Sequence, residues 1–202
     1  VERVDLYYAH HDDASVPLAD VLGTFSALVD EGAVAAYGLS NYTPARVGEA
    51  LELAAREGYA APVALQPHYS LVHRAEVEAG GLADLAVTHD LAIAPYYALA
   101  SGFLTGKYRR GEPVAGARGP RVAAYLTEPG FALLDELTAV AGEAGATPAA
   151  VALAWLRARR GVAAPIASAT GPEQVAHLLA GARLVLDPAH TERLTRASQP
   201  FT

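Results

Sequence analysis

The chain has 202 residues, of which 52% are hydrophobic and 18% are charged, and its formal net charge is −7. This composition supports one domain with a packed core and is too apolar for a disordered chain. The acidic balance argues against a nucleic-acid or anionic-membrane partner, because both need excess positive charge. The chain has no cysteine, which excludes disulfides, thiolate metal sites and cysteine nucleophiles, so a reducing cytoplasm is the expected compartment.

The sequence does not have the pattern of a membrane span or of a secretory signal. Its most apolar stretch, Leu91 to Leu104, contains Pro95 and Gly102 and is shorter than the roughly 20 residues of a spanning helix. The first residues are charged and lead directly into an apolar run, so no secretory leader is expected. The chain has no methionine, not even an initiator, and we therefore expect it to begin inside a longer parent.

Short apolar runs alternate with longer stretches of helical periodicity. Thr43-Pro44 and Thr147-Pro148 are typical of helix starts, because threonine caps a helix and proline fits its first turn. A long connection rich in Gly, Pro and Arg is expected over Ala100 to Gly130. In chain order the sequence predicts strand Val4–Ala9, helix Leu18–Glu31, strand Val34–Leu39, helix Ala45–Glu57, strand Val63–Gln66, helix Glu76–Thr88, strand Leu91–Tyr97, helices Phe131–Ala144 and Ala149–Arg159, strand Val162–Ala167, and helices Pro172–Ala182 and Pro188–Ala197.

The alternation of strands with helices predicts an α/β fold with a parallel sheet. The sheet is either open and doubly wound or part of a (β/α)₈ barrel. Neither a GxGxxG nor a GxxxxGK[ST] pattern follows any predicted strand, which weakens the open-sheet nucleotide-binding interpretation. A complete barrel needs eight βα units and typically about 250 residues, and this chain supplies five.

Polar side chains stand at the carboxyl ends of the predicted strands, where barrel proteins place their sites. His10, Asn41, Gln66 and Tyr96 come from four different strand ends. Together they would form an amide-rich pocket that suits a neutral ligand with a carboxamide and an aromatic ring. The run from His10 to Asp13 is not expected to bind a metal, because neighbouring strand residues point to opposite faces.

Five segments carry a resemblance to the aldo-keto reductase superfamily. They are Asp5–His10 (DLYYAH), Gly38–Tyr42 (GLSNY), Leu65–Tyr69 (LQPHY), Tyr96–Tyr108 (YYALASGFLTGKY) and Ala164–Thr170 (APIASAT). They occur in the order and at the spacing of that family. The likeness covers essentially the whole chain, from the fourth strand of the family's barrel to its C-terminal helix.

The resemblance implies a partial TIM (β/α)₈ barrel, with about five of the eight βα units in a single domain, residues 1–202. It also implies an oxidoreductase that transfers a hydride from NADPH to an aldehyde or ketone, with a small carbonyl compound as substrate. His10 would be the catalytic histidine, holding the carbonyl oxygen and assisting proton delivery.

The resemblance assigns the other site residues to the cofactor, and no metal is implied. They are Ser40, Asn41 and Gln66 at the nicotinamide carboxamide, Tyr96 on the nicotinamide ring, Leu99, Ser101, Gly102, Leu104, Lys107 and Arg118 over the pyrophosphate, and Ser168 and Gln174 at the 2′-phosphate and adenine.

The sequence also departs from the family pattern. Thr170 stands where many relatives have a basic residue, and His177 and Leu178 replace a common Glu-Asn pair, so NAD(H) stays open beside NADP(H). His68 occupies a position that is often acidic in relatives. The family's proton-donating Tyr, with its Lys and Asp, would precede Val1.

Side chains outside these motifs are expected to have structural or surface positions. Trp155 is expected to pack within its helix. The remaining histidines that we expect at the surface are His73, His89, His177 and His190.

Three interpretations follow. The first is an enzyme fragment, the C-terminal five-eighths of an NADP(H)-dependent aldo-keto reductase. The second is a truncated, non-catalytic NADP(H)-binding or regulatory module. The third is a partial barrel completed by another copy of the chain, which makes it a homo-oligomer. A chain that lacks three βα units would have two unpaired strand edges and exposed apolar patches.

Overall fold

The structure is a computed structural model that describes residues 2–112 and 119–202. The strands of the described part are β1 (Val4–Ala9), β2 (Val34–Ser40), β3 (Ala64–Gln66) and β4 (Ala92–Ile93). The helices are α1 (Leu18–Asp30), α2 (Pro44–Glu57), α3 (Leu82–Thr88), α4 (Gly119–Val122), α5 (Glu128–Glu143), α6 (Pro148–Arg157), α7 (Pro172–Arg183) and α8 (Pro188–Ala197). Short 3₁₀ helices are η1 (Ala100–Thr105), η2 (Ala123–Tyr125) and η3 (Gln199–Phe201).

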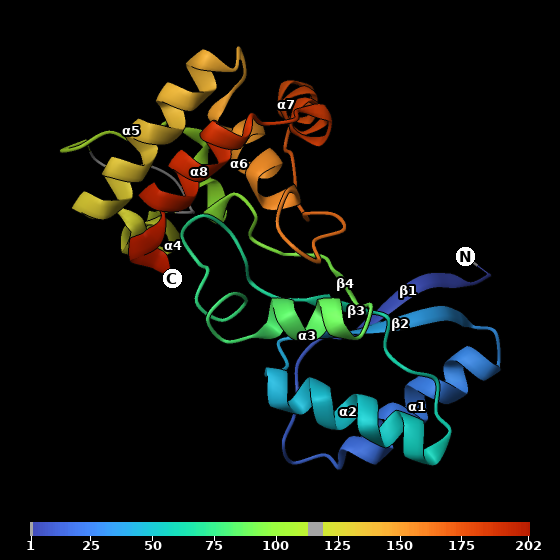
Figure 1. Ribbon diagram of the computed structural model, residues 1–202. Coiled ribbons are helices and arrows are strands. Elements are labelled where there is room, and N and C mark those ends of the chain that lie inside the picture. Colours follow the sequence, from blue (N-terminus) through green and yellow to red (C-terminus); the bar gives the residue numbers. More distant parts are fainter. Residues whose placement is uncertain (1, 113–118) are drawn as a thin grey trace.

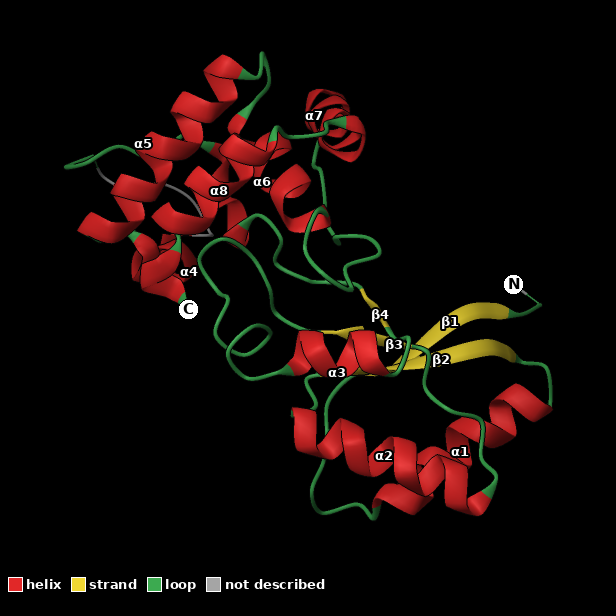
Figure 2. Cartoon of the chain, viewed as in Figure 1, coloured by secondary structure: helices red, strands yellow, loops and turns green. Residues whose placement is uncertain are grey.

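The strands form one parallel sheet in the order β1-β2-β3-β4, which confirms the predicted α/β class. Figures 1 and 2 show this sheet with α1 and α2 at one end of the molecule, and α4 to α8 gathered at the other end. The register pairs Tyr8 with Gly38 and Ser40 with Gln66. The carboxyl ends of the strands therefore lie along a common edge.

The predicted fifth strand, Val162–Ala167, is not a regular strand. The chain there runs beside β4, where Ile93 N donates to Gly161 O (2.8 Å) and Ala163 N donates to Ile93 O (2.9 Å). Only Val162 makes a ladder bridge, to Ile93. The predicted strand Leu91–Tyr97 is likewise regular only over β4, because Pro95 lacks a backbone donor.

One predicted helix is shorter than expected and another begins earlier. Helix α3 begins at Leu82, not at Glu76, because Gly81 takes a left-handed conformation (φ 84°) that interrupts the helix. Helix α5 begins three residues before Phe131, where the side chain of Thr127 accepts a hydrogen bond from Gly130 N. The long connection after β4 contains η1, α4 and η2 in its described part.

The two Thr-Pro helix starts are confirmed. The hydroxyl oxygens of Thr43 and Thr147 each accept a backbone hydrogen bond at 3.2 Å, from Arg46 N and Ala150 N. Each threonine satisfies one of the backbone N–H groups that a helix start leaves without a partner. These caps fix where α2 and α6 begin.

The apolar core is one continuous cluster that extends from the sheet into the helical part of the molecule. Trp155 of α6 is fully buried, as predicted, and its indole N–H donates to Thr195 Oγ1 of α8 (3.0 Å). Among the described residues, no single helix is long and apolar enough to cross a membrane. Helices α5 and α6 together have the length and apolar composition of a membrane span, but the chain bends by 95° between them.

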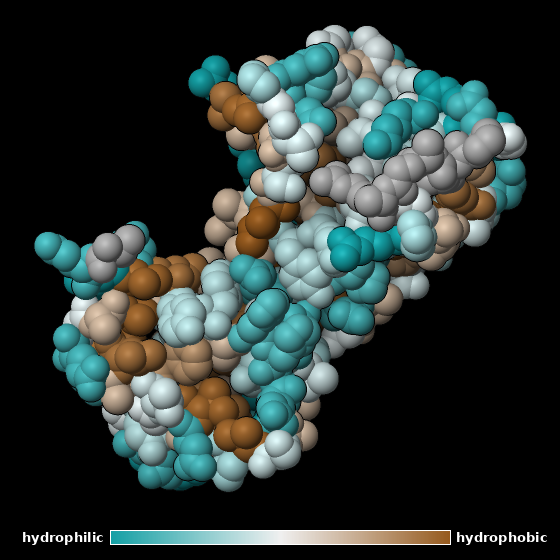
Figure 3. All heavy atoms as spheres, turned by 180° about the vertical axis from the view of Figure 1, so that it is seen from behind, coloured by the Kyte–Doolittle hydropathy of each residue, from teal (hydrophilic) through white to brown (hydrophobic). Residues whose placement is uncertain are grey.

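Apolar side chains are exposed on β1 and around α7. Leu6 and Tyr7 on β1 are 38% and 49% exposed, and Val185 after α7 is 85% exposed. Figure 3 shows apolar side chains gathered on the sheet part of the molecule and a hollow between the two parts. The outer edge of β1 has no strand partner among the described residues. Two unpaired edges were expected, and β1 supplies one of them, whereas the outer side of β4 is hydrogen-bonded to residues 161 and 163.

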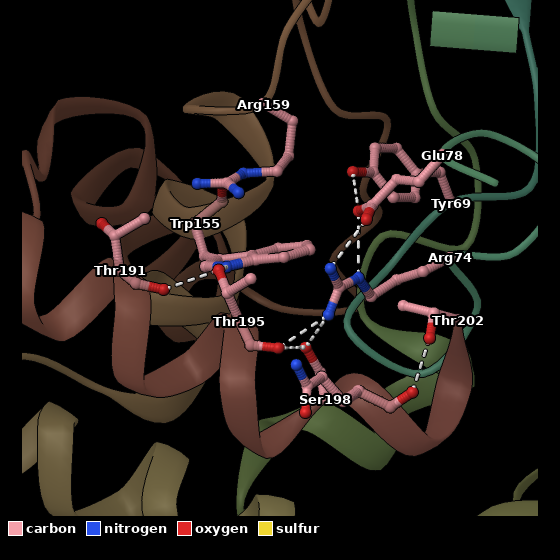
Figure 4. Close-up of polar contacts among 10 residues, drawn as sticks. Tyr69, Arg74, Glu78, Trp155, Arg159, Thr191, Thr195, Ser198 and Thr202 are labelled. Atoms are coloured by element: carbon pink, nitrogen blue, oxygen red, sulfur yellow. Dashed lines mark hydrogen bonds and ion pairs between the residues drawn. The ribbon is translucent and has the colours of Figure 1, made fainter. Parts of the chain in front are cut away.

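A buried arginine joins the two parts of the molecule (Figure 4). Arg74, which is 4% exposed, lies in the segment between β3 and α3. Its Nε and Nη2 donate to the two carboxylate oxygens of Glu78 at 2.9 and 2.7 Å, and its Nη1 donates to Ser198 Oγ (2.6 Å). Its backbone N–H donates to Phe201 O (3.0 Å), so the C-terminal turn is bound to the sheet part.

Two aromatic residues contact this ion pair: Tyr69 contacts Glu78, and Trp155 contacts Arg74. Tyr69 donates its hydroxyl to Glu78 Oε1 (2.6 Å), and the guanidinium carbon of Arg74 lies 5.4 Å from the Trp155 ring centroid. Burial raises the pKa of Glu78, but the hydrogen bonds from Arg74 and Tyr69 outweigh it and hold the pKa below its usual value. The carboxylate therefore stays charged and paired at neutral pH.

We expect Arg74→Ala to lower the free energy of unfolding by about 3 kcal/mol, because it leaves the Glu78 carboxylate without its buried partner. Urea unfolding followed by circular dichroism measures the loss. The matched control is Arg196→Ala, whose long contact to Glu192 (3.7 Å) is exposed. This control is expected to cost less than about 1 kcal/mol. Equal losses in the two variants would contradict the role assigned to Arg74.

Candidate functional site

Hydrogen bonds connect the carboxyl ends of the strands. Asn41 follows β2 in a left-handed conformation (φ 59°) that asparagine tolerates. Its Nδ2 donates to His10 O (2.9 Å) and to Ser40 Oγ (3.1 Å), and its Oδ1 accepts from the Tyr96 hydroxyl (2.7 Å). Ser40 in turn donates to Gln66 O (2.8 Å). Asn41 thus holds four strand ends in a fixed relation.

The first of two cavities at this edge has a volume of about 520 Å³, and we call it the His68 cavity. It lies beyond β2 and β3 and reaches the first residues of α2 and α3. Its lining residues are Leu39, Asn41, Tyr42, Thr43, Pro44, Leu65, Gln66, Pro67, His68, His73, Glu76, Gly80, Leu82 and Tyr96.

Two histidine rings are stacked in the wall of the His68 cavity. The ring centroids of His68 and His73 are 3.7 Å apart with an angle of 8° between the planes. His68 also stacks on Tyr96, with centroids 5.3 Å apart. Burial, together with the neighbouring His73, lowers the pKa of His68 to about 4. His68 is therefore neutral at pH 7.

The second cavity has a volume of about 620 Å³, and we call it the Lys107 cavity. It lies between the segment after β4, the start of α6 and the start of α7. Its lining residues are Tyr96, Tyr97, Ala98, Leu99, Ser101, Gly102, Thr105, Lys107, Arg121, Thr147, Pro148, Ala149, Ile166, Ala167, Ser168, Gln174, His177 and Leu178.

The backbone beside the Lys107 cavity is strained. Ala100 and Ser101 have φ values of 48° and 57°, which cost energy in non-glycine residues, and Gly102 follows at 98°. Gly106 approaches the start of α6 so closely that a Cβ there would lie 2.7 Å from Pro148 Cγ. The tight path of η1 brings Lys107 to the cavity, and such strain is common at ligand sites.

The structure brings most of the predicted site residues to the two cavities. Asn41, Gln66 and Tyr96 line the His68 cavity, and Tyr96 also lines the Lys107 cavity. The predicted residues that line the Lys107 cavity with it are Leu99, Ser101, Gly102, Lys107, Ser168 and Gln174.

Three predicted residues of the described part line neither cavity. His10 is exposed at the end of β1 and stacks on His11, with centroids 4.8 Å apart. Ser40 and Leu104 are fully buried and line neither cavity. Arg118 lies outside the described residues.

Sequence reasoning missed several cavity residues. His73, expected at the surface, is partly buried against His68, and its Nε2 lies 3.7 Å from Glu76 Oε1. His177 and His190 are also partly buried, whereas His89 is exposed as expected. Arg121 lines the Lys107 cavity, and no pattern in the sequence marked it. The sequence predicts a helix from Glu76 onward, so it does not indicate that Glu76 lies in a turn and lines the His68 cavity.

The side chains of the described ranges do not form a metal site, since no three or more His, Asp or Glu residues there are arranged to hold an ion. The run from His10 to Asp13 has other contacts instead. Asp12 pairs with Arg46 at 3.0 Å, and Asp13 accepts a hydrogen bond from the Ser15 hydroxyl (2.6 Å).

The chain is an α/β protein whose parallel sheet has two adjoining cavities at its carboxyl edge, the place where such sheets commonly bind small molecules. A sequence model of the Aldo/keto reductase family matches residues 1–199. The chain belongs to the aldo/keto reductase family.

Individual relatives share close to a third of the sequence. The chain is 30% identical to a probable voltage-gated potassium channel subunit beta of rice over 182 residues, which cover 87% of the chain and 55% of the rice protein. It is 32% identical over its full length to an uncharacterized oxidoreductase of Mycobacterium tuberculosis, covering 61% of that protein. It is 30% identical over 87% of its length to an L-glyceraldehyde 3-phosphate reductase of Escherichia coli, covering 52% of that protein. The chain thus spans little more than half the length of these relatives.

Protonation of His68 is expected to destabilise the fold. The unfolded chain takes up this proton near pH 6.5, whereas the folded chain takes it up only near pH 4. Between these values the unfolded state binds more protons, so the free energy of unfolding falls as the pH is lowered from about 6.5 to about 4. Urea unfolding at a series of pH values measures this slope. His68→Gln is expected to reduce it and the exposed control His89→Gln to keep it, and an unchanged slope in His68→Gln would contradict this account.

Proposed function

We propose that the chain is the cofactor-binding part of an NADP(H)-dependent oxidoreductase that reduces aldehydes or ketones to alcohols. The observation that carries the proposal is the pair of adjoining cavities that share Tyr96. One offers amide and aromatic side chains, and the other offers Lys107 and Arg121. A dinucleotide needs such a divided site, because its nicotinamide is a flat amide-bearing ring and its phosphates are anionic.

The Lys107 cavity fits the phosphate-bearing part of a dinucleotide. Lys107 is the only lysine of the chain, and it lines this cavity together with Arg121. No Asp or Glu is among the described lining residues, so these cations are available to an anion. At the far end, Gln174 Oε1 accepts from Thr170 N (2.9 Å), which leaves its amide N–H groups free to contact an adenine or ribose.

The strand-end residues fit the nicotinamide part. Both Asn41 Nδ2 hydrogen bonds are used within the protein, so in this proposal Asn41 mainly positions Tyr96 as a platform for the ring. Gln66 lines the His68 cavity with its side-chain amide nitrogen free of hydrogen bonds in the described structure, and it would donate to the carboxamide oxygen. When bound, the nicotinamide supplies the hydride.

His10 has a separate role in this proposal. It stands at the end of β1, exposed to the same edge of the sheet, where its imidazole would hold the oxygen of the substrate carbonyl. Its backbone carbonyl is held by Asn41 Nδ2, so the strand end that carries the ring is fixed relative to Tyr96.

We further propose that the chain forms about five of the eight βα units of a TIM barrel. The free edge of β1, the exposed apolar residues of β1 and α7, and the span of little more than half of each relative support this. The remaining units would pair with β1 and cover the segment 162–167. A second candidate, a non-catalytic NADP(H)-binding module, is favoured by the likeness to proteins named as potassium channel beta subunits.

NADPH is expected to bind the chain and to protect Lys107 from an amine-modifying reagent. Modification by trinitrobenzenesulfonate, followed by peptide mass spectrometry, measures the protection, with the N-terminal amine as an internal control. Lys107→Met is expected to weaken NADPH binding about tenfold in a fluorescence titration, because it removes a charge-assisted contact to phosphate. Arg196→Gln, on the outer face of α8, is the control. Unprotected Lys107 at saturating NADPH would contradict the assignment of this cavity.

His10→Ala is expected to change the NADPH affinity of the chain by less than twofold, because His10 lines neither cavity. Carbonyl reduction, measured as NADPH oxidation with a panel of aldehydes, separates the candidates. Binding without turnover is expected of the 202 residues alone, because the proposed proton donor belongs to another part of the barrel. Turnover by the chain alone that survives in His10→Ala would contradict the roles given to His10 and to the missing units.

A further inference from the structure

Tyr97 has a backbone conformation that bulky residues rarely adopt. It follows Tyr96, which makes a parallel ladder bridge to His68 beyond the end of β4. The φ angle of Tyr97 is 53°, in the left-handed region that suits glycine or asparagine. This conformation costs free energy, and it persists only where the surrounding structure requires it.

The other left-handed residues of the described part are of kinds that tolerate this region better. Apart from glycines they are Asn41, Asp90, Ala100 and Ser101. Asparagine and aspartate bear positive φ angles more easily than most residues, and alanine and serine have small side chains. Tyr97 is therefore the large side chain of this group, and its strain calls for a separate explanation.

The left-handed backbone determines where the Tyr97 ring lies. In an extended strand, neighbouring side chains point to opposite faces. The ring centroids of Tyr96 and Tyr97 are nevertheless only 5.1 Å apart, with 62° between the planes. The Tyr97 centroid also lies 5.2 Å from that of His68, again edge to face. The strained turn thus brings the Tyr97 ring beside Tyr96, the wall that the two cavities share.

Burial does not account for this arrangement. Tyr97 is 44% exposed and lines the Lys107 cavity. A half-exposed ring gains less from packing than a buried one, so little stabilisation offsets its strained backbone. Strained residues of this kind cluster at ligand sites, where the strain directs a side chain toward the ligand.

The two cavities differ in charge on either side of this corner. Among the described lining residues, the Lys107 cavity has Lys107 and Arg121 and neither Asp nor Glu. The His68 cavity has the carboxylate of Glu76 and neither Lys nor Arg. The anionic part of a ligand is therefore favoured in the Lys107 cavity. A longer ligand that continues into the other cavity has to pass the rings of Tyr96 and Tyr97.

We propose that Tyr97 is a specificity-determining residue, whose ring contacts a ligand at the point where the ligand passes from one cavity to the other. It selects elongated ligands that occupy both cavities over anionic fragments that stay in the Lys107 cavity. This role rests on the proposed NADP(H) binding, and Tyr97 is not among the cofactor residues that the family resemblance assigns.

Two substitutions separate the strain from the loss of the ring. Tyr97→Gly and Tyr97→Ala both remove the ring, but only glycine relieves the left-handed backbone. We expect the thermal unfolding midpoint of Tyr97→Gly to lie about 3 °C above that of Tyr97→Ala, the reverse of their order in a regular strand or helix. Asp90→Gly and Asp90→Ala are the matched control, because Asp90 has the same conformation (φ 54°), is exposed and lines neither cavity.

Ligand affinity then tests the role of the ring. NADPH is followed by fluorescence titration, and adenosine 2′,5′-bisphosphate, which lacks the nicotinamide half, by calorimetry. Tyr97→Ala and Tyr97→Gly are expected to weaken NADPH about fivefold, the scale of one aromatic contact, and the bisphosphate less than twofold. Tyr97→Phe keeps the ring and is expected to restore most of the lost NADPH affinity. The Asp90 variants are expected to leave both affinities unchanged.

Several results would overturn the role of Tyr97. They are an unchanged NADPH affinity in Tyr97→Ala, an equal loss for NADPH and the bisphosphate, and a midpoint of Tyr97→Gly below that of Tyr97→Ala. NADPH that protects Lys107 but binds the Tyr97 variants as tightly as the unmodified chain removes this role alone. If the unmodified chain does not bind NADPH, the proposed function fails and the role of Tyr97 fails with it.

Discussion

The arrangement of the site depends on one ion pair, between the buried Arg74 and the partly buried Glu78. Arg74 Nη1 also donates to Thr195 O and Ser198 Oγ, so this arginine joins the segment between β3 and α3 to C-terminal residues 121 to 124 positions away in the sequence. That same segment carries His68, His73 and Glu76, the wall of the His68 cavity. A guanidinium with five donors can bind a carboxylate and a helix end at once, which a lysine cannot do. The contacts of Arg74 therefore hold in place the segment that forms the cavity wall.

Charged side chains elsewhere in the described part also form ion pairs. In this acidic protein most arginines of the described part have a carboxylate partner, as in the pairs of Arg46 with Asp12 and of Arg193 with Glu136. Such partly exposed pairs add little stability. Lys107 and Arg121 lie along a cavity whose described lining has no carboxylate, so no acidic side chain of that lining offsets their positive charge.

The features that could be predicted from the sequence are local. The Thr43-Pro44 cap, β1 and β2, and the polar residues at the strand ends follow from short patterns with a direct physical meaning. The stacking of His68 on His73 was not predictable, because it depends on a turn whose helical appearance ends at Gly81. The composition of segment 162–167 predicts a strand, but whether the segment pairs as one depends on the strands beside it. Long-range contacts such as Arg74 to Ser198 leave no periodic signal.

Tyr96 has a consequence that extends beyond either cavity. Its hydroxyl is tied to Asn41, its ring lies against His68, and it borders both hollows. Occupants on the two sides therefore share a surface, and a shift of this ring caused by one is felt by the other. Thermodynamic linkage then requires reciprocity: the factor by which the first occupant changes the affinity of the second equals the factor in the reverse direction. Tyr96 would in this sense couple binding in one cavity to binding in the other.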